Sequence, residues 1–148
     1  MARKKVPWVR SVWYIVCVCG LLALAGCGSR FKLVPVSGTV TLDGKPVTNY
    51  AVTFNPDPAK GNTNPVTCVG KLNAEGQFGL RTLAVKAREG GGGAPLGWYK
   101  VTLRSGLPGM PEPEVEINPQ YRDPNKTPLS VEVVANPEPG RYDIKLEK

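Results

Sequence analysis

The sequence has no histidine in its 148 residues. Histidine is the side chain that most often acts as a general base near neutral pH, and it is the commonest metal ligand. Its absence excludes Ser-His-Asp and Cys-His catalytic sites and zinc sites built on imidazole. A run of four glycines at 90–93 fits neither common phosphate-loop motif. We therefore expect no enzymatic activity, no cofactor and no bound metal.

Acidic residues are missing from the start of the chain, where the first one is Asp43. The whole sequence has 19 Lys and Arg against 12 Asp and Glu, a net charge of +7. Four of these cations lie in the first ten residues, and without them 15 cations face 12 acids. The others are scattered and form no basic run, so the sequence predicts no nucleic-acid partner.

The clearest apolar stretch, at residues 12–24, follows those four N-terminal cations. A basic segment and then a short apolar segment are typical of a secretory signal peptide. A permanent membrane span needs about 20 apolar residues. This stretch ends in small and polar residues at 25–30, so it is short for a span and fits a signal peptide better.

Leu24, Ala25, Gly26 and Cys27 follow the apolar stretch directly. They resemble the lipobox of bacterial lipoproteins, in which signal peptidase recognises the residues before a cysteine. The resemblance implies that Cys27 is acylated and becomes the first residue of an exported chain, held by its lipid at a membrane of the bacterial cell envelope. Two or three acyl chains anchor a protein durably. An uncleaved signal anchor, or cleavage without lipidation, stays open as the alternative.

Cysteine becomes scarce once this segment is removed. Cys17 and Cys19 lie inside the signal peptide and Cys27 is the acylation site, so Cys68 is alone in the folded part and no disulfide can form there. Nothing near Cys68 in the sequence would lower its thiol pKa. This favours a packed side chain over a reactive one.

The rest of the chain shows no helix of ordinary length, but short alternating segments between turn residues. Strands are expected at 36–42, 47–54, 66–72, 77–83, 98–104, 129–135 and 142–146. Asp43-Gly44 is a strong hairpin signal, and the glycine run within 86–95 predicts a flexible loop. Turn residues at 136–140 predict that the last two strands pair. The pattern predicts an all-β fold, a single seven-stranded antiparallel Greek-key sandwich.

Five stretches, at 36–47, 73–78, 93–102, 119–124 and 129–133, resemble in order the transthyretin-like, carboxypeptidase regulatory-like domain of small bacterial lipoproteins. The resemblance implies a transthyretin-like or immunoglobulin-like β-sandwich. It implies no activity, because the catalytic sites of zinc carboxypeptidases and of hydroxyisourate hydrolase both depend on histidine. The expected organisation is a signal peptide at 1–26, a lipid anchor and tether at 27–34, and the sandwich domain at 35–148.

Two sets of side chains are candidates for binding. Glu112, Glu114 and Glu116 alternate and could hold a hard cation, but a proline-rich extended strip splays them, which favours a solvated acidic edge. Trp98 and Tyr121 could contact a sugar or another small ligand. Core packing is the competing interpretation for the aromatics, and alternation lets only one of Trp98 and Tyr99 face outward.

Two functions follow from these patterns. The first is a membrane-anchored, non-catalytic envelope lipoprotein whose sandwich is a binding or structural module for an envelope protein or polysaccharide. The alternative is a small-ligand or carbohydrate-binding domain that uses Trp98 and Tyr121.

Overall fold

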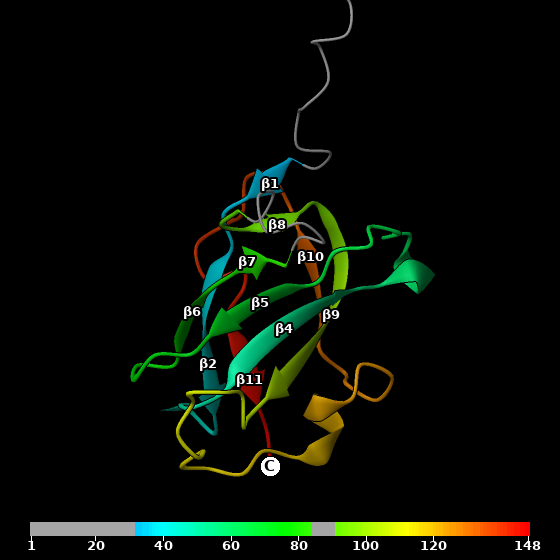
Figure 1. The fold of residues 1–148 in the computed structure, drawn as a ribbon. Helices are drawn as coiled ribbons and strands as arrows, with labels where there is room; N and C mark the ends of the chain where they lie inside the picture. The colour runs from blue at the N-terminus through cyan, green and yellow to red at the C-terminus, as the bar shows by residue number, and fades with distance from the viewer. Residues whose placement is uncertain (1–31, 84–90) are drawn as a thin grey trace, which may run out of the picture. The chain divides into compact units, whose positions relative to one another are not determined.

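The computed structural model describes residues 32–83 and 91–148 (Figure 1). These residues are all-β, apart from two short 3-10 helices. The elements in chain order are β1 (Leu33–Val34), β2 (Ser37–Leu42), β3 (Lys45–Pro46), β4 (Ala51–Pro56), η2 (Pro58–Lys60), β5 (Cys68–Lys71), β6 (Gln77–Gly79), β7 (Arg81–Thr82), β8 (Ala94–Pro95), β9 (Gly97–Arg104), η3 (Pro119–Arg122), β10 (Ser130–Val133) and β11 (Ile144–Leu146).

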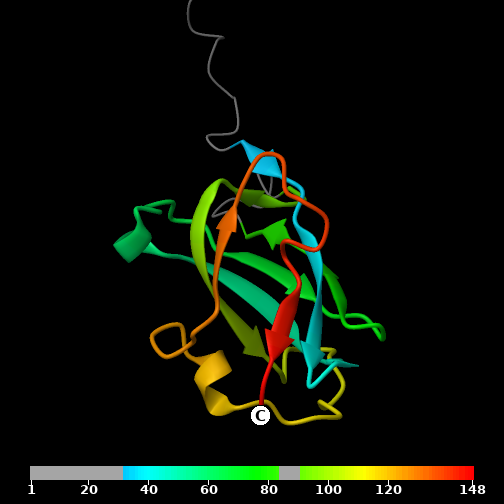
Figure 2. The same ribbon diagram turned by 180° about the vertical axis from the view of Figure 1, so that it is seen from behind.

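The strands form two layers, consistent with a β-sandwich. One layer is a five-stranded antiparallel sheet in the order β10-β9-β4-β5-β7, and Figure 1 shows β4 and β5 of this sheet in front. The other layer contains β11, β2 and β3, with β6 also paired to β2, and its β2 and β11 come to the front in Figure 2. Strands β1 and β8 form a separate two-stranded sheet.

The core lies between these layers because the longer strands turn their apolar side chains inward. On β9, Tyr99, Val101 and Leu103 are fully buried, and on β2 the same holds for Val40. The ring of Phe54 lies 6.2 Å from that of Phe78 and 5.8 Å from that of Tyr99, both tilted. Such tilted pairs are favourable beyond their buried area, so these aromatics join the two layers at their centre.

The hairpin predicted at Asp43-Gly44 is confirmed. Leu42 pairs with Lys45, and the two residues between them have φ values of 49° and 80°. Positive φ at both central positions is the type I′ geometry, whose twist matches that of the flanking strands. Aspartate tolerates the left-handed region and glycine has no Cβ to oppose it, so this dipeptide fits the turn.

One predicted strand begins later than expected, and another proves to be divided. Residues 47–54 were expected as one strand, but β3 ends at Pro46, Asn49 takes a φ of 60° and β4 begins only at Ala51. Residues 77–83 divide because β6 pairs with β2 whereas β7 pairs with β5. The chain thus passes from one layer to the other at Leu80, a step that alternating hydrophobicity does not reveal.

The prediction of a wholly antiparallel, seven-stranded sandwich is wrong in two respects. The described residues contain eleven strands, and β11 runs parallel to β2. The expected pairing of 129–135 with 142–146 does not occur, because β10 pairs with β9 instead. The turn between them exists, with a φ of 76° at Gly140, but it carries the chain across the core from one layer to the other.

Two segments that were expected to be flexible, the tether at 27–34 and the loop at 86–95, are partly ordered. The predicted tether at 27–34 already contains β1, whose Leu33 and Val34 pair with Pro95 and Ala94, so the folded part begins before residue 35. Of the predicted flexible loop at 86–95, residues 86–90 lie outside the described residues. The amide of Gly93 donates to the Leu80 carbonyl (2.7 Å), and the Gly91 carbonyl accepts from the amide of Thr82 (3.1 Å). This part of the glycine run is therefore an ordered edge.

Among the described residues, no helix is long and apolar enough to cross a membrane.

Candidate functional site

The predicted lipidation site lies outside the described residues. This applies to Cys27 and to Leu24, Ala25 and Gly26 before it. The other predicted site residues fall within the β domain, where the structure separates the exposed ones from those in the core.

The outer face of the five-stranded sheet is the surface where the predicted Trp98 lies. Cross-strand registers place every second residue of each strand on this side, away from the core. We define the outer face by Ala51, Thr53, Asn55, Val69, Lys71, Arg81, Trp98, Lys100, Thr102, Arg104, Ser130 and Glu132. It is the side of β4 and β5 that is seen in Figure 1.

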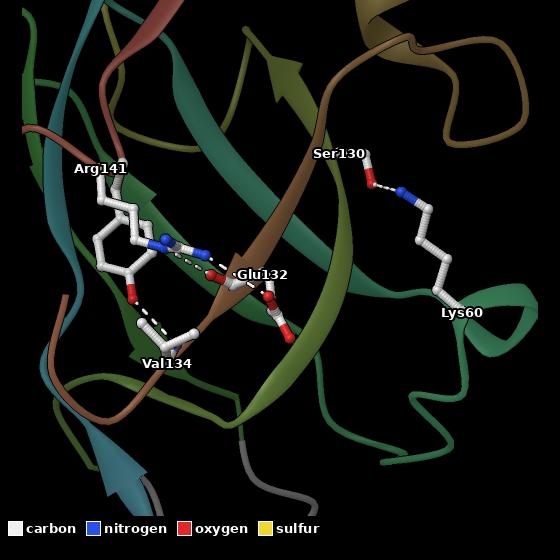
Figure 3. A network of polar contacts seen from close by, with 6 residues as sticks. Lys60, Ser130, Glu132, Val134 and Arg141 are labelled. Atoms are coloured by element: carbon white, nitrogen blue, oxygen red, sulfur yellow. Dashed lines mark hydrogen bonds and ion pairs between the residues drawn. The ribbon is translucent and has the colours of Figure 1, made fainter. Parts of the chain in front are cut away.

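Trp98 is half-buried at one end of the outer face, and Lys60 holds it there. The ammonium nitrogen of Lys60 lies 4.0 Å from the Trp98 ring centroid, within the range of a cation–π interaction. The same nitrogen donates to the hydroxyl of Ser130 at 2.8 Å, a contact drawn in Figure 3. Lys60 therefore links the loop after β4 to β10 across the indole.

The loop that carries Lys60 is fixed by its own sequence. Proline at positions 56 and 58 ends β4, and the Asp57 carboxylate caps η2 by accepting from the Ala59 amide at 3.2 Å. Gly61 follows with a φ of 83°, which closes the short helix. The Asn62 side chain donates to the Trp98 carbonyl at 2.8 Å, so the loop is tied to the start of β9.

An ion pair lies beside Trp98 on the edge strand. Glu132 is directly opposite Trp98 in the β10–β9 register, and its carboxylate lies 3.5 Å from the Arg141 guanidinium. Arg141 also donates through Nε to the backbone carbonyl of Glu132 at 3.4 Å (Figure 3). Both side chains are more than a third exposed, so this pair contributes little stability, about 0–1 kcal/mol. The ion pair matters instead for the charge of this surface, because Arg141 neutralises Glu132, the one carboxylate among the residues that define the outer face.

The other predicted aromatic, Tyr121, does not share this surface. It lies in η3 and is 5% exposed, and its hydroxyl forms 3.3 Å hydrogen bonds with the backbone of Glu147. A two-ring platform of Trp98 and Tyr121 is therefore wrong, because Tyr121 belongs to the core. The prediction that only one of Trp98 and Tyr99 faces outward is confirmed.

Tyr99 is the inward partner of that pair. Its hydroxyl donates to the Pro95 carbonyl at 2.9 Å. Burial raises the pKa of Tyr99 to about 12 despite an opposing hydrogen bond with Asn62, and nearby Cys68 adds to the rise. Because burial penalises the charged phenolate, Tyr99 stays neutral and serves the core.

Cys68 is packed, as the sequence predicts. It is fully buried, and its sulfur lies 3.5 Å from the hydroxyl of Thr82. Burial raises the pKa of the thiol, an effect that the hydrogen bond with Thr82 only partly offsets. The reactive thiolate is therefore disfavoured.

Glu112, Glu114 and Glu116 are exposed, which agrees with the predicted solvated edge. In the described part of the chain, no three or more Cys, Asp or Glu side chains gather as metal ligands. Glu114 contributes to an open pocket of about 380 Å³ at the ends of β2 and β3. The pocket is lined by Leu42, Asp43, Lys45, Pro46, Glu114, Val115 and Lys148. Asp43 and Lys148 pair across it at 3.6 Å, so it mixes charges of both signs.

Four cations on the outer face were not predicted from the sequence as site residues. Lys71, Arg81, Lys100 and Arg104 come from three different strands and are scattered in the sequence. The register brings them together, since Lys71 and Arg104 both flank Ala51, and Arg81 pairs with Val69. Strand alternation could have predicted their direction. Each of the four cations is next to a buried residue in the sequence, and neighbouring side chains of a strand point to opposite faces, so the cation faces outward.

Comparisons with known proteins end without a match: no family model, no curated protein and no solved structure is found to be similar to this chain.

Proposed function

We propose that this protein is a lipid-anchored component of the bacterial cell envelope whose β domain binds or scaffolds and does not catalyse. The observation that carries the proposal is the order of basic residues, apolar stretch and Leu24-Ala25-Gly26-Cys27 at the N-terminus. Lipid attached to Cys27 holds the chain at the membrane, so the domain needs no apolar surface for anchoring.

The chemistry of the domain supports a non-catalytic role. The sequence offers no histidine as a general base. The one cysteine of the β domain, Cys68, is buried, and its thiol is held neutral. The all-β fold is compatible with the transthyretin-like domain that the sequence stretches suggest, and β-sandwich folds host many functions.

Substitution of the acceptor cysteine tests the anchor. We expect that Cys27→Ala abolishes metabolic palmitate labelling and leaves an unprocessed precursor, because the thiol is the lipid acceptor. Cys19→Ala is the matched control, since Cys19 lies nearby but outside the lipobox-like residues, and it should keep both the label and the processing. Palmitate that persists in Cys27→Ala would refute the proposal.

A second candidate, a small-ligand or carbohydrate-binding domain, is favoured by one observation. The half-buried Trp98 lies on the outer face with Lys60 and Ser130 beside it. In this form the site uses Trp98 without Tyr121. Glycan-array binding by the purified protein, lost on Trp98→Ala, would favour it over a protein scaffold, and crosslinking to an envelope protein with an empty array would favour the scaffold.

A further inference from the structure

The outer face has a strongly one-sided charge. Lys71 and Arg104 stand at one end of it, Arg81 and Lys100 lie further along, and the ammonium of Lys60 reaches its Trp98 end. Glu132 is the one acid among the residues that define the face. A surface with several cations and one acid attracts anions over distances of about 10 Å at moderate salt.

Four of these cations, Lys71, Arg81, Lys100 and Arg104, are available for a ligand, whereas the ammonium of Lys60 already contacts Ser130 and the Trp98 ring. Among residues 32–83 and 91–148, ion pairs join Arg141 to Glu132 and Lys148 to Asp43, and neither involves a cation of the outer face. The pairing of Glu132 with Arg141 also removes the carboxylate that would otherwise offset the positive charge. The face therefore keeps its positive charge in the folded domain.

The layout of the cations fits a polymer rather than a small anion. Lys100 and Arg104 are four residues apart on β9, a separation of about 13 Å between their backbones. Lys71 and Arg104 lie two strand spacings apart across Ala51, about 10 Å. One phosphate or carboxylate cannot bridge such distances, whereas a chain with repeated negative charges can contact each cation in turn.

The neutral side chains of the face fit sugars. Between the cations, Thr53 and Thr102 are buried and the half-buried Asn55 is the neutral polar residue that reaches the surface. At the far end, the half-buried ring of Trp98 and the exposed Ser130 flank the ammonium of Lys60. An aromatic ring can stack against the apolar face of a sugar ring, while hydroxyl groups pair with polar neighbours. We propose that the outer face binds an anionic polysaccharide that lies across strands β5, β4 and β9 and ends at Trp98.

A membrane surface is the competing anionic partner. Docking on lipid requires exposed apolar side chains that enter the interface. Apart from Trp98, the largest apolar residue of the outer face is the half-buried Val69, and the exposed Leu83 lies beyond the end of β7. The polysaccharide is therefore the better match, and vesicles belong in the test.

This inference names the ligand class of the proposed binding module and rests on that function. Its test uses the full-length chain in detergent micelles and polygalacturonate, a polysaccharide of regular carboxylates, immobilised for binding measurements. We expect saturable binding that weakens as salt is added, and no binding to neutral dextran, because charge carries the attraction.

Two double variants locate the binding. Lys71→Gln with Arg104→Gln removes two cations from the outer face, and we expect affinity for polygalacturonate to fall about tenfold or more. Lys45→Gln with Lys145→Gln is the matched control, because it removes the same charge from exposed residues on the opposite layer. It should change the affinity by less than about twofold. Equal losses in both variants would overturn the proposal, since net charge alone would then explain the binding.

Trp98→Ala separates sugar from lipid. We expect it to weaken polygalacturonate binding further while cosedimentation with phosphatidylglycerol vesicles stays unchanged. Vesicle binding that depends on Lys71 and Arg104, without polygalacturonate binding, would overturn the proposal in favour of a membrane surface. Binding to an oligonucleotide as strong as to polygalacturonate would also overturn it. None of these results alters palmitate labelling at Cys27, so failure here and failure of the anchor are distinguishable.

Discussion

At the scale of single residues, Tyr99 couples the stability of the fold to alkaline pH. Its pKa rises from 10.0 to about 12 in the folded chain because the phenolate would be buried. Between these values the unfolded chain loses a proton that the folded chain keeps, so the stabilising contribution is complete below pH 10 and is lost as pH rises toward 12. Cys68 acts in the same direction from its ordinary pKa of 9.0.

We therefore expect urea midpoints to fall as pH rises above 9 to 10, with a shallower fall in Tyr99→Phe. The variant is less stable at neutral pH, since it loses the hydrogen bond to Pro95, but it has no phenol to titrate at this position. The comparison is between slopes against pH rather than between absolute midpoints. Equal slopes in the two proteins would show that Tyr99 does not cause the effect.

A substitution at Gly44 measures the free-energy cost of backbone strain without a steric clash. A Cβ at this position would meet no atom within 4 Å, but its φ of 80° is one that side chains rarely adopt. Gly44→Ala should destabilise the domain by about 1 kcal/mol. Gly79 is the matched control, because it has equal space and no positive φ, so that Gly79→Ala should be neutral or slightly stabilising. Chemical denaturation midpoints measure both, and an equal loss would argue against the type I′ turn.

At the scale of elements, the described part of the glycine run, residues 91–93, is an ordered edge against β7. Gly92 forms a bridge with Arg81, and Gly93 has a φ of 110° where a Cβ would collide with the carbonyl oxygen of Val34. Deleting Gly91 and Gly92 would shift these contacts out of register. We therefore expect the deletion to destabilise the domain, whereas shortening a flexible loop would have little effect.

A pair of alanine substitutions tests this edge. Gly93→Ala should destabilise by about 1–2 kcal/mol, since it adds both strain and a clash with β1. Gly92→Ala should have little effect, because its Cβ would meet nothing within 4 Å and its φ is not positive. Thermal denaturation of the two variants gives the comparison. If they were equally stable, the β1–β8 sheet would not be needed for folding.

The elements also show which features can be predicted from sequence. The strand at 98–104 and the turn at Asp43-Gly44 were predictable, because alternation and turn preference are local properties. The partners of β10 and β11 were not, since pairing depends on which layer each strand completes. The outer face was predictable only in part. Alternation shows that Lys71 and Arg104 face outward, but only the strand register shows that they are neighbours.

At the scale of the whole molecule, residues 32–83 and 91–148 belong to one compact unit. A chain that begins at Lys32 should fold as a stable β protein, with a β-type circular dichroism spectrum and one cooperative transition. A chain that begins at Val36 lacks β1 and leaves Ala94 and Pro95 without their strand partners. We expect it to unfold at a lower temperature. The same transition temperature in both would place β1 outside the cooperative unit.

The parallel pairing of β2 with β11 has a consequence for how the chain acquires its fold. Beside this pairing, the backbone amide of Thr39 donates to the Asp143 carboxylate at 2.9 Å, and the two residues are 104 positions apart in the sequence. Contacts this distant require closure of a very large loop, and folds dominated by them form slowly. Because β11 follows all the other described strands in the sequence, one edge of β2 stays unpaired during synthesis until β11 has been made. The nascent domain is then most exposed to aggregation or proteolysis just before its final strand arrives.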